Sequence, residues 1–307
     1  MICRQAADLE RKRFMKKTHR QLIIWPILLL ATLFLAGCAK DEQTSKSQIK
    51  IVTSTNIYAD IAQNIVGKYG KATALIANGN SNPHDYEPTT NAAKTVADAD
   101  IIVANGMGYD SWMGNLAASN GKKAVKVGED LMQLDSSANP HIWYNLNMPK
   151  KYVAYLVKKL SKLDKKHASY YQAQGKKYLQ KIAKIEKVAD GIKGSKAKPV
   201  FVSEPVFDYA LERTGFKIGN KNFEEATEKE TDPSAAVIAQ MNEAIKKKQI
   251  PFFVNNTQAS SDTVKYFVKK AKKQGIPIVE VRETMPNKVS YADWMLDNYQ
   301  KLAKFGD

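Results

Sequence analysis

Short apolar runs alternate with helical patterns in the first half of the chain. Residues 49–53 form a β-branched run that is typical of a buried strand, and residues 57–66 repeat apolar side chains at helical spacing. Residues 72–76 and 100–106 predict two further strands, and residues 91–98 predict a short helix between them. Because buried strands alternate with helices, the pattern predicts a parallel α/β sheet.

The middle of the chain, residues 149–192, has a helical pattern almost throughout. Leu156, Leu160 and Leu163 keep one apolar stripe, and residues 168–192 continue the pattern as a Lys-rich amphipathic helix. A helix of this length between two α/β halves predicts a rigid connection rather than a flexible linker.

The second half returns to alternating strands and helices. Strands are predicted at residues 199–203, 251–255 and 276–281, and helices at residues 232–248, 261–274 and 291–304. Ligands of parallel α/β sheets bind in the crevice beyond the carboxyl ends of the strands. Polar residues at the predicted strand ends are therefore the candidates for a functional site.

The N-terminal segment predicts export rather than a fold element. Residues 11–20 are basic, residues 22–34 are nearly all apolar, and Leu35-Ala36-Gly37-Cys38 follows. This order is typical of a secretory signal peptide, and the apolar run is short for a membrane span. Leu-Ala-Gly-Cys resembles the bacterial lipobox. We therefore expect cleavage before Cys38, lipidation of that residue, and a short polar tether over residues 38–48.

The composition excludes several functional classes. Hydrophobic residues make up 44% and charged residues 25% of the chain, as in a soluble globular protein and not a multi-span membrane protein. The formal net charge is +16, but the lysines are spread along the predicted helices without an Arg-rich arm, a zinc finger or an aromatic RNA-binding motif. No nucleic-acid partner is therefore expected. Both cysteines, Cys3 and Cys38, precede the folded body, which leaves it without a disulfide or a Cys ligand.

Two Asn-Pro-His sequences present imidazoles on stiff loops. Proline fixes its own φ and pushes the preceding residue towards extended backbone, so Asn82-Pro83-His84 and Asn139-Pro140-His141 should each hold a ring at a defined point. Glu204 and Glu283 each follow a predicted strand. Two imidazoles and two carboxylates suit manganese, iron(II) or zinc. The predicted metal ligands are His84, His141, Glu204 and Glu283.

Other titratable residues near these positions are assigned no ligand role. His167 lies inside a Lys-rich helical pattern and is expected to be an ordinary helix residue. Asp85, Glu87 and Asp208 lie close to the candidate ligands in sequence. We expect them to be solvated loop charges rather than groups that orient the imidazoles.

Four motifs match one protein family. Pro83-His84-Asp85-Tyr86-Glu87-Pro88-Thr89 looks like its first His loop, and Asn139-Pro140-His141-Ile142-Trp143 looks like its second. Residues 97–112 resemble its Ala-Asp…Asn-Gly…Trp segment, and Ser203-Glu204 matches its third ligand position. The family is that of the extracytoplasmic zinc- and manganese-binding lipoproteins of bacterial metal ABC importers (cluster A-I solute-binding proteins, with a lipoprotein adhesin group). The resemblance runs from about residue 49 to the C-terminus.

The resemblance implies an α/β fold of two lobes, each with a mostly parallel sheet flanked by helices, joined by one long rigid helix, with the metal buried between the lobes. The expected segments are a signal peptide (1–37), a lipid-anchored tether (38–48), an N-terminal lobe (49–164), a connecting helix (165–193) and a C-terminal lobe (194–307). It also implies a monomer at the outer face of the cell membrane, with an ABC permease and its ATPase as partners. The transported ligand would be Mn²⁺ or Zn²⁺.

This chain departs from the family pattern in two ligand loops. Where relatives carry an Asp after the last strand, it has Arg282-Glu283-Thr284, so Glu283 is carried over as the fourth ligand, with Asp262 and Asp293 as alternatives. Asn139 stands where an Asp is usual in the second His loop. The chain has no His-rich loop of the zinc-specific kind, and its third ligand is Glu, which favours manganese. Zinc accepts the same ligands and binds most sites more tightly.

The ligand set favours metal capture over catalysis. Four protein ligands leave no open position for a water or a substrate, so the chain is not expected to be an enzyme. A metal-dependent hydrolase with Glu204 as its base is the enzymatic alternative. A lipid-anchored binding protein for a small organic solute is the second alternative, and an adhesin role could accompany metal uptake.

Overall fold

The computed structural model describes residues 48–81, 83, 86–195, 197–258 and 261–306. Three residues singled out in the sequence, Cys38, His84 and Asp85, lie outside the described residues, as does the predicted signal peptide. Within the described part, no helix has the length and apolar character needed to cross a bilayer.

The N-terminal lobe is built on one parallel sheet with the strand order β2-β1-β3-β4. Its strands are β1 (Ile49–Thr55), β2 (Gly70–Ile76), β3 (Ile101–Ala104) and β4 (Val125–Lys126). Successive side chains of a strand point to opposite faces. Ile51 and Val103 therefore pack with α2 (Asn56–Val66), while Val52 and Ile102 pack with α3 (Thr90–Ala97) and α4 (Ser111–Ser119). The sheet is thus buried on both faces, as the apolar runs predicted.

The C-terminal lobe repeats this arrangement on a smaller scale. Its parallel sheet has the order β5-β6-β7, with β5 (Phe201–Val202), β6 (Phe253–Asn256) and β7 (Ile278–Val281). Phe201 and Phe253 pack with α9 (Ala235–Lys246) and α10 (Asp262–Lys273). The remaining helices of this lobe are α7 (Asp208–Arg213), α8 (Lys221–Glu228) and α11 (Tyr291–Ala303). Two parallel sheets flanked by helices confirm the predicted fold class.

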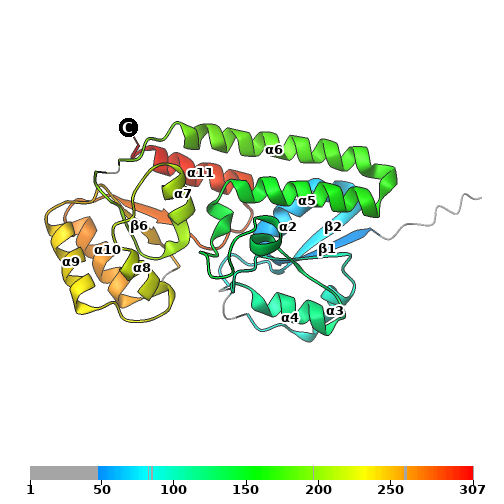
Figure 1. The fold of residues 1–307 in the computed structure, drawn as a ribbon, viewed down its shortest axis with the longest axis horizontal. Helices are drawn as coiled ribbons and strands as arrows, with labels where there is room; N and C mark the ends of the chain where they lie inside the picture. Colours follow the sequence, from blue (N-terminus) through cyan, green and yellow to red (C-terminus); the bar gives the residue numbers. More distant parts are fainter. Residues whose placement is uncertain (1–47, 82, 84–85, 196, 259–260, 307) are drawn as a thin grey trace, which may run out of the picture. The chain divides into compact units, whose positions relative to one another are not determined.

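The long helical pattern is divided into two helices. α5 (Asn147–Leu163) and α6 (Ala168–Asp190) pack against each other as a hairpin, with a 3₁₀ turn (Lys165–His167) between them (Figure 1). The break falls at Asp164, whose Oδ2 accepts a hydrogen bond from the Tyr171 hydroxyl at 2.9 Å and lies 2.6 Å from His167 Nδ1. The long helix is therefore present as α6, and it packs against α11 of the other lobe.

The two lobes share one hydrophobic core. Residues of α2 and α5 belong to the same buried cluster as residues of β6, β7 and α11. The short turn Ile142–Tyr144 lies within this cluster, and all three of its side chains are completely buried. Residues 48–307 accordingly form a single compact unit rather than two independent ones.

A hydrogen-bonded clamp joins the segment after β2 to the segment after β7. Arg282 donates to the carbonyl oxygen of Gly79 at 2.7 Å and to Asn80 Oδ1 at 3.0 Å, and the Thr284 hydroxyl also donates to the Gly79 carbonyl. The Gly79 N–H donates to Asn287 Oδ1 at 3.1 Å. The clamp holds the chain that leads into the first His loop against the segment that carries Glu283.

The clamp predicts that Gly79→Ala destabilises the protein. A Cβ at Gly79 would overlap the carbonyl oxygen of Met285, which is backbone and cannot rotate away. We expect a loss of about 1–3 kcal/mol, the usual cost of overpacking, measured by denaturant unfolding. Gly114→Ala is the matched control, because Gly114 lies inside α4 with no atom within 4 Å of the added Cβ. Equal stability of the two variants would contradict the clamp.

Candidate metal centre

His141 is completely buried and is held by the side chain two residues before it. Asn139 Oδ1 accepts the backbone N–H of His141 at 2.9 Å and lies 2.7 Å from ring atom Nδ1. An amide oxygen can only accept, so Nδ1 must carry a hydrogen, and the neutral ring then has its lone pair on Nε2. Nε2 is therefore the atom of His141 that can bind a metal ion.

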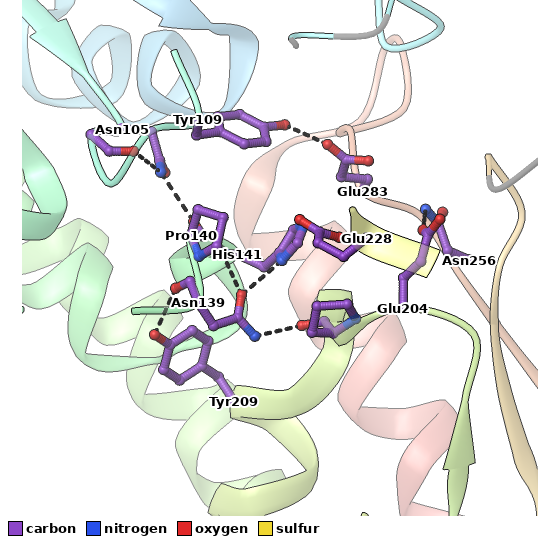
Figure 2. Close-up of polar contacts among 12 residues, drawn as sticks. Asn105, Tyr109, Asn139, Pro140, His141, Glu204, Tyr209, Glu228, Asn256 and Glu283 are labelled. Carbon is purple, nitrogen blue, oxygen red and sulfur yellow. Dashed lines mark hydrogen bonds and ion pairs between the residues drawn. The ribbon is translucent and has the colours of Figure 1, made fainter. Parts of the chain in front are cut away.

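Asn139 also connects the second His loop to the C-terminal lobe. Its Nδ2 donates to the carbonyl oxygen of Pro205 at 2.6 Å, and its own carbonyl accepts the Tyr209 hydroxyl at 2.8 Å (Figure 2). Pro205 directly follows Glu204, so one amide side chain orients His141 and fixes the backbone beside a second candidate ligand. The Asp that is usual at this position could not donate to Pro205.

The loop after β3 supports the site from the N-terminal lobe. Asp110, which is buried, accepts the N–H groups of Asn105 and Gly106 at 2.6 and 2.9 Å. Burial raises the pKa of this carboxyl, although these hydrogen bonds favour its charged form. Asn105 Nδ2 then donates to the carbonyl oxygen of Pro140 at 3.0 Å. The Asn-Gly motif seen in the sequence thus positions the loop that carries His141.

Glu283 and Glu204 each accept a hydrogen bond from a neighbouring side chain. The Tyr109 hydroxyl donates to Glu283 Oε1 at 3.0 Å, and Asn256 Nδ2 donates to Glu204 Oε2 at 2.6 Å (Figure 2). Burial raises the pKa of Glu283, while the Tyr109 hydrogen bond acts in the opposite direction. Tyr109 comes from the N-terminal lobe, so this contact links the two lobes at the site.

Glu228 is a further carboxylate in this region, and no sequence pattern marks it. Its Oε1 lies 3.9 Å from His141 Nε2, the ring atom that is able to bind a metal ion. Burial, together with repulsion from Glu204 and Glu283, raises the pKa of Glu228 to about 7. Glu228 ends α8, a helix whose sequence has only one large apolar side chain, Phe223, and therefore too weak a periodicity to predict.

The structure describes three of the four predicted ligands. His141 faces Glu228, and the charges of Glu204 and Glu283 reach the same carboxylate, while His84 lies outside the described residues. Among the residues that are described, no three His, Cys, Asp or Glu side chains are close enough together to hold a metal ion. The assignment of the four ligands therefore stays a prediction.

Neither alternative to Glu283 lies at the site. The side chain of Asp262 is 99% exposed and pairs with Lys265 at 3.0 Å. Asp293 accepts the Ser290 hydroxyl at 2.6 Å at the start of α11, where it belongs to the helix cap. Of the three carboxylates considered for the fourth ligand position, Glu283 is the one that contacts the N-terminal lobe, through Tyr109.

Asp208 is not the solvated loop charge that we expected. It is 6% exposed at the start of α7 and shares a hydrogen bond with Glu224 of α8, which is 2% exposed. Burial raises the pKa of both carboxyls, and Glu224 holds the proton that joins them. This pair fastens α8, and with it Glu228, to the segment that follows Glu204.

The chain belongs to the family described as zinc-uptake complex component A, periplasmic, whose model matches residues 51–305. It is similar to the manganese-binding lipoprotein MntA of Halalkalibacterium halodurans, with 32% identity over 66% of this chain and 69% of the relative. It is also similar to the metal ABC transporter substrate-binding lipoprotein ScbA of Streptococcus cristatus, with 28% identity over 91% of this chain and 96% of the relative. These findings confirm the family resemblance seen in the sequence.

A solved structure shares the fold. The solute-binding protein FpvC of P. aeruginosa, in complex with Ni²⁺, superposes with a TM-score of 0.69 at 19% identity, over 84% of this chain and 96% of that chain. At this identity the likeness shows the fold alone, and it supports the two-lobe architecture.

The role of Asn139 predicts a loss of metal affinity on substitution. Asn139→Ala removes the acceptor that sets the ring tautomer, so we expect Mn²⁺ or Zn²⁺ to bind about 10–100-fold more weakly in a calorimetric titration. Asn139→Asp keeps that acceptor and should bind more tightly than Asn139→Ala. If Asn139→Ala binds as tightly as the unsubstituted chain, the orienting role is wrong.

The buried carboxyls predict that the metal-free protein loses stability as pH rises. Because the folded-state pKa values of Asp208, Glu224 and Glu228 lie above their ordinary values, the folded state holds these protons more tightly than the unfolded state does. Their contribution is complete below about pH 4 and is lost as pH rises through the raised values, near 7 for Glu228.

We therefore expect the melting temperature of the metal-free protein to fall by several degrees between about pH 5 and pH 8. Glu224→Gln can still donate to Asp208, so it should flatten this dependence. Glu230→Gln removes an exposed carboxylate just beyond the end of α8 and should leave the dependence unchanged. Equal slopes in all three proteins would contradict the account of the pair.

Proposed function

We propose that this protein captures a divalent transition metal ion, Mn²⁺ or Zn²⁺, outside the membrane and delivers it to the permease and ATPase of an ABC importer. The family assignment and the names of the relatives, a manganese-binding lipoprotein and a metal ABC transporter substrate-binding lipoprotein, support this function. They also support a binding protein rather than an enzyme.

The observation that carries the proposal is one oriented imidazole opposite several carboxylates. Asn139 directs Nε2 of His141 towards Glu228, and the charges of Glu204 and Glu283 add to that of Glu228. Such a group of half-buried carboxylates repels anions, and a cation relieves the repulsion among them. Nitrogen and oxygen donors together suit manganese and zinc better than magnesium or calcium, which prefer oxygen ligands.

We assign His84, His141, Glu204 and Glu283 as the ligands. His141 contributes Nε2, and the two carboxylates supply the negative charge that neutralises the ion. Glu228 lies beside these ligands, and we infer that it stabilises the approaching ion through its charge. The Mn²⁺ relatives favour manganese as the transported ion.

We also propose that the protein is a monomer anchored to the outer face of the cell membrane through a lipid on Cys38. Residues 1–37 would be removed as a signal peptide, and residues 38–48 would form the tether. The lobes would then be residues 49–164 and 194–307, with residues 165–193 as the connection. The lipobox-like sequence and the lipoprotein relatives support this arrangement.

The proposal predicts a metal-dependent rise in melting temperature. A ligand at a thousandfold excess over its Kd stabilises a protein by about 4.1 kcal/mol, which is roughly a 10 °C shift for a body of this size. The measurement is a thermal-shift titration of the mature protein with Mn²⁺, Zn²⁺ and both in competition. His84→Ala and Glu283→Gln should each lose most of the shift.

Glu280→Gln is the control for Glu283→Gln, because Glu280 lies three residues earlier, on β7, with its side chain 58% exposed. It should retain the full shift. If Glu283→Gln keeps the shift while His84→Ala loses it, the fourth ligand is misassigned. If the unsubstituted protein shows no metal-dependent shift, metal capture is wrong and a small organic solute becomes the better candidate.

A further inference from the structure

The positive charge of the folded body is concentrated in the α5–α6 hairpin, residues 147–190. From residue 48 onward the chain has 38 Lys and Arg against 27 Asp and Glu, a surplus of eleven. The hairpin alone has twelve lysines against three carboxylates, a surplus of nine. Nearly all of the excess charge therefore lies on two helices and the turn between them, and the rest of the body is close to neutral.

The hairpin lysines face solvent and are mostly unpaired with carboxylates. Lys150 forms an ion pair with Glu186 at 2.7 Å, and within the described residues no other lysine of the hairpin forms one. Ten of the twelve lysines are exposed. The proposed metal capture makes no use of this charge. Like charges gathered on one surface also repel each other and lower stability, so their concentration here calls for another role.

Apolar surface accompanies the lysines. Leu163, at the end of α5, is 40% exposed, and Leu179 of α6 is 36% exposed. Leu179 lines a groove of roughly 820 Å³ between the two helices, together with Val157 and the side chains of Lys158 and Lys176. Lysine stems that border apolar surface, with the ammonium groups in water, are typical of a face that meets lipid headgroups.

The turn of the hairpin lies beside the start of the folded chain. The ring of His167 stacks on that of Tyr69 with centroids 3.7 Å apart, and Tyr170 packs edge-on against the same ring. Tyr69 directly precedes Gly70, which pairs with Ile49, the first residue of β1. Figure 1 shows the α5–α6 turn on the same side as the start of β1. The first strand of the described chain therefore starts on the side of the body that carries Lys165 and Lys166, both of which are exposed.

We propose that the turn and the lysine-rich outer surface of the α5–α6 hairpin lie against the anionic headgroups of the membrane in which the protein is anchored. The inference rests on the lipid anchorage in the proposed function. From Cys38 to Gln48 the chain spans at most about 35 Å when fully extended, so an anchored Cys38 keeps the turn close to the bilayer. Each lysine near an anionic surface contributes about 1 kcal/mol.

Such a contact would fix the orientation of the body on the membrane. The hairpin turn lies at the N-terminal edge of β1 and β2, whereas His141, Glu204 and Glu283 follow the carboxyl ends of strands or the loops beyond them. Attachment through the turn leaves the metal-binding loops uncovered by lipid. The proposed metal site then stays accessible to solvent and to the permease.

The test is co-sedimentation with vesicles of phosphatidylcholine, with or without phosphatidylglycerol, using the mature chain with Cys38→Ser so that no lipid is attached. We expect binding only to the phosphatidylglycerol vesicles, and weaker binding as salt rises. The double variant Lys165→Glu, Lys166→Glu should bind at least about thirtyfold more weakly. Both substitutions place negative charge at the start of α6, where it favours the helix, so the variant should fold.

The matched control is Lys269→Glu, Lys273→Glu, which makes the same change in net charge on exposed positions of α10. This variant should bind the vesicles almost as the parent does. Equal weakening of both variants would show an effect of net charge alone and would overturn the proposal, as would the absence of binding by the parent.

The Mn²⁺ and Zn²⁺ thermal shift of the same three proteins separates this inference from the proposed function. All three should keep the full shift, because none of the substituted lysines lies at the metal site. If the parent does not bind vesicles but keeps the metal shift, the membrane contact is overturned and metal capture is not. Vesicle binding without any metal shift in the parent supports the membrane contact and overturns metal capture.

Discussion

The position of His141 depends on one buried turn that both lobes share. Ile142, Trp143 and Tyr144 follow the ring directly and are completely buried in the core that joins the lobes. Hydroxyl groups of α11 bond this turn from the other lobe, with Tyr291 donating to the carbonyl of Trp143 at 2.6 Å and Tyr299 to that of Tyr144 at 2.9 Å. The loop that presents the imidazole is therefore fixed by the packing of the whole body.

This shared core sets how the site can respond to an ion. Lobes that pack through one continuous apolar cluster cannot separate without exposing it, so movement between them is expected to be small. The carboxylates at the site are only partly solvated, and their repulsion is already present in the folded state. A divalent cation at the proposed site would relieve that repulsion, and the shared core limits how far the lobes can move in response.

The sequence predicted the strongly patterned parts of this fold and missed the weakly patterned ones. The β-branched runs at β1 and β3 and the amphipathic pattern of α10 were sufficient to predict strands and helices, because burial imposes a clear period on them. α8 was missed because most of its side chains are polar and only Phe223 and Glu224 are buried. The break at Asp164 was missed because its hydrogen bonds to Tyr171 and His167 are local tertiary contacts that leave no apolar signature.

The residues of the candidate site also divide into those that the sequence marks clearly and those that it does not. Motifs and strand ends mark His141, Glu204 and Glu283 as candidates in the sequence, whereas Glu228 and the Asp208–Glu224 pair depend on how α8 packs. Anomalous diffraction from metal-loaded crystals, collected at the manganese and zinc edges, tests the central claim most directly. The account predicts one peak within bonding distance of His141 Nε2, Glu204 and Glu283. A peak elsewhere, or none in crystals grown with saturating metal, would contradict it.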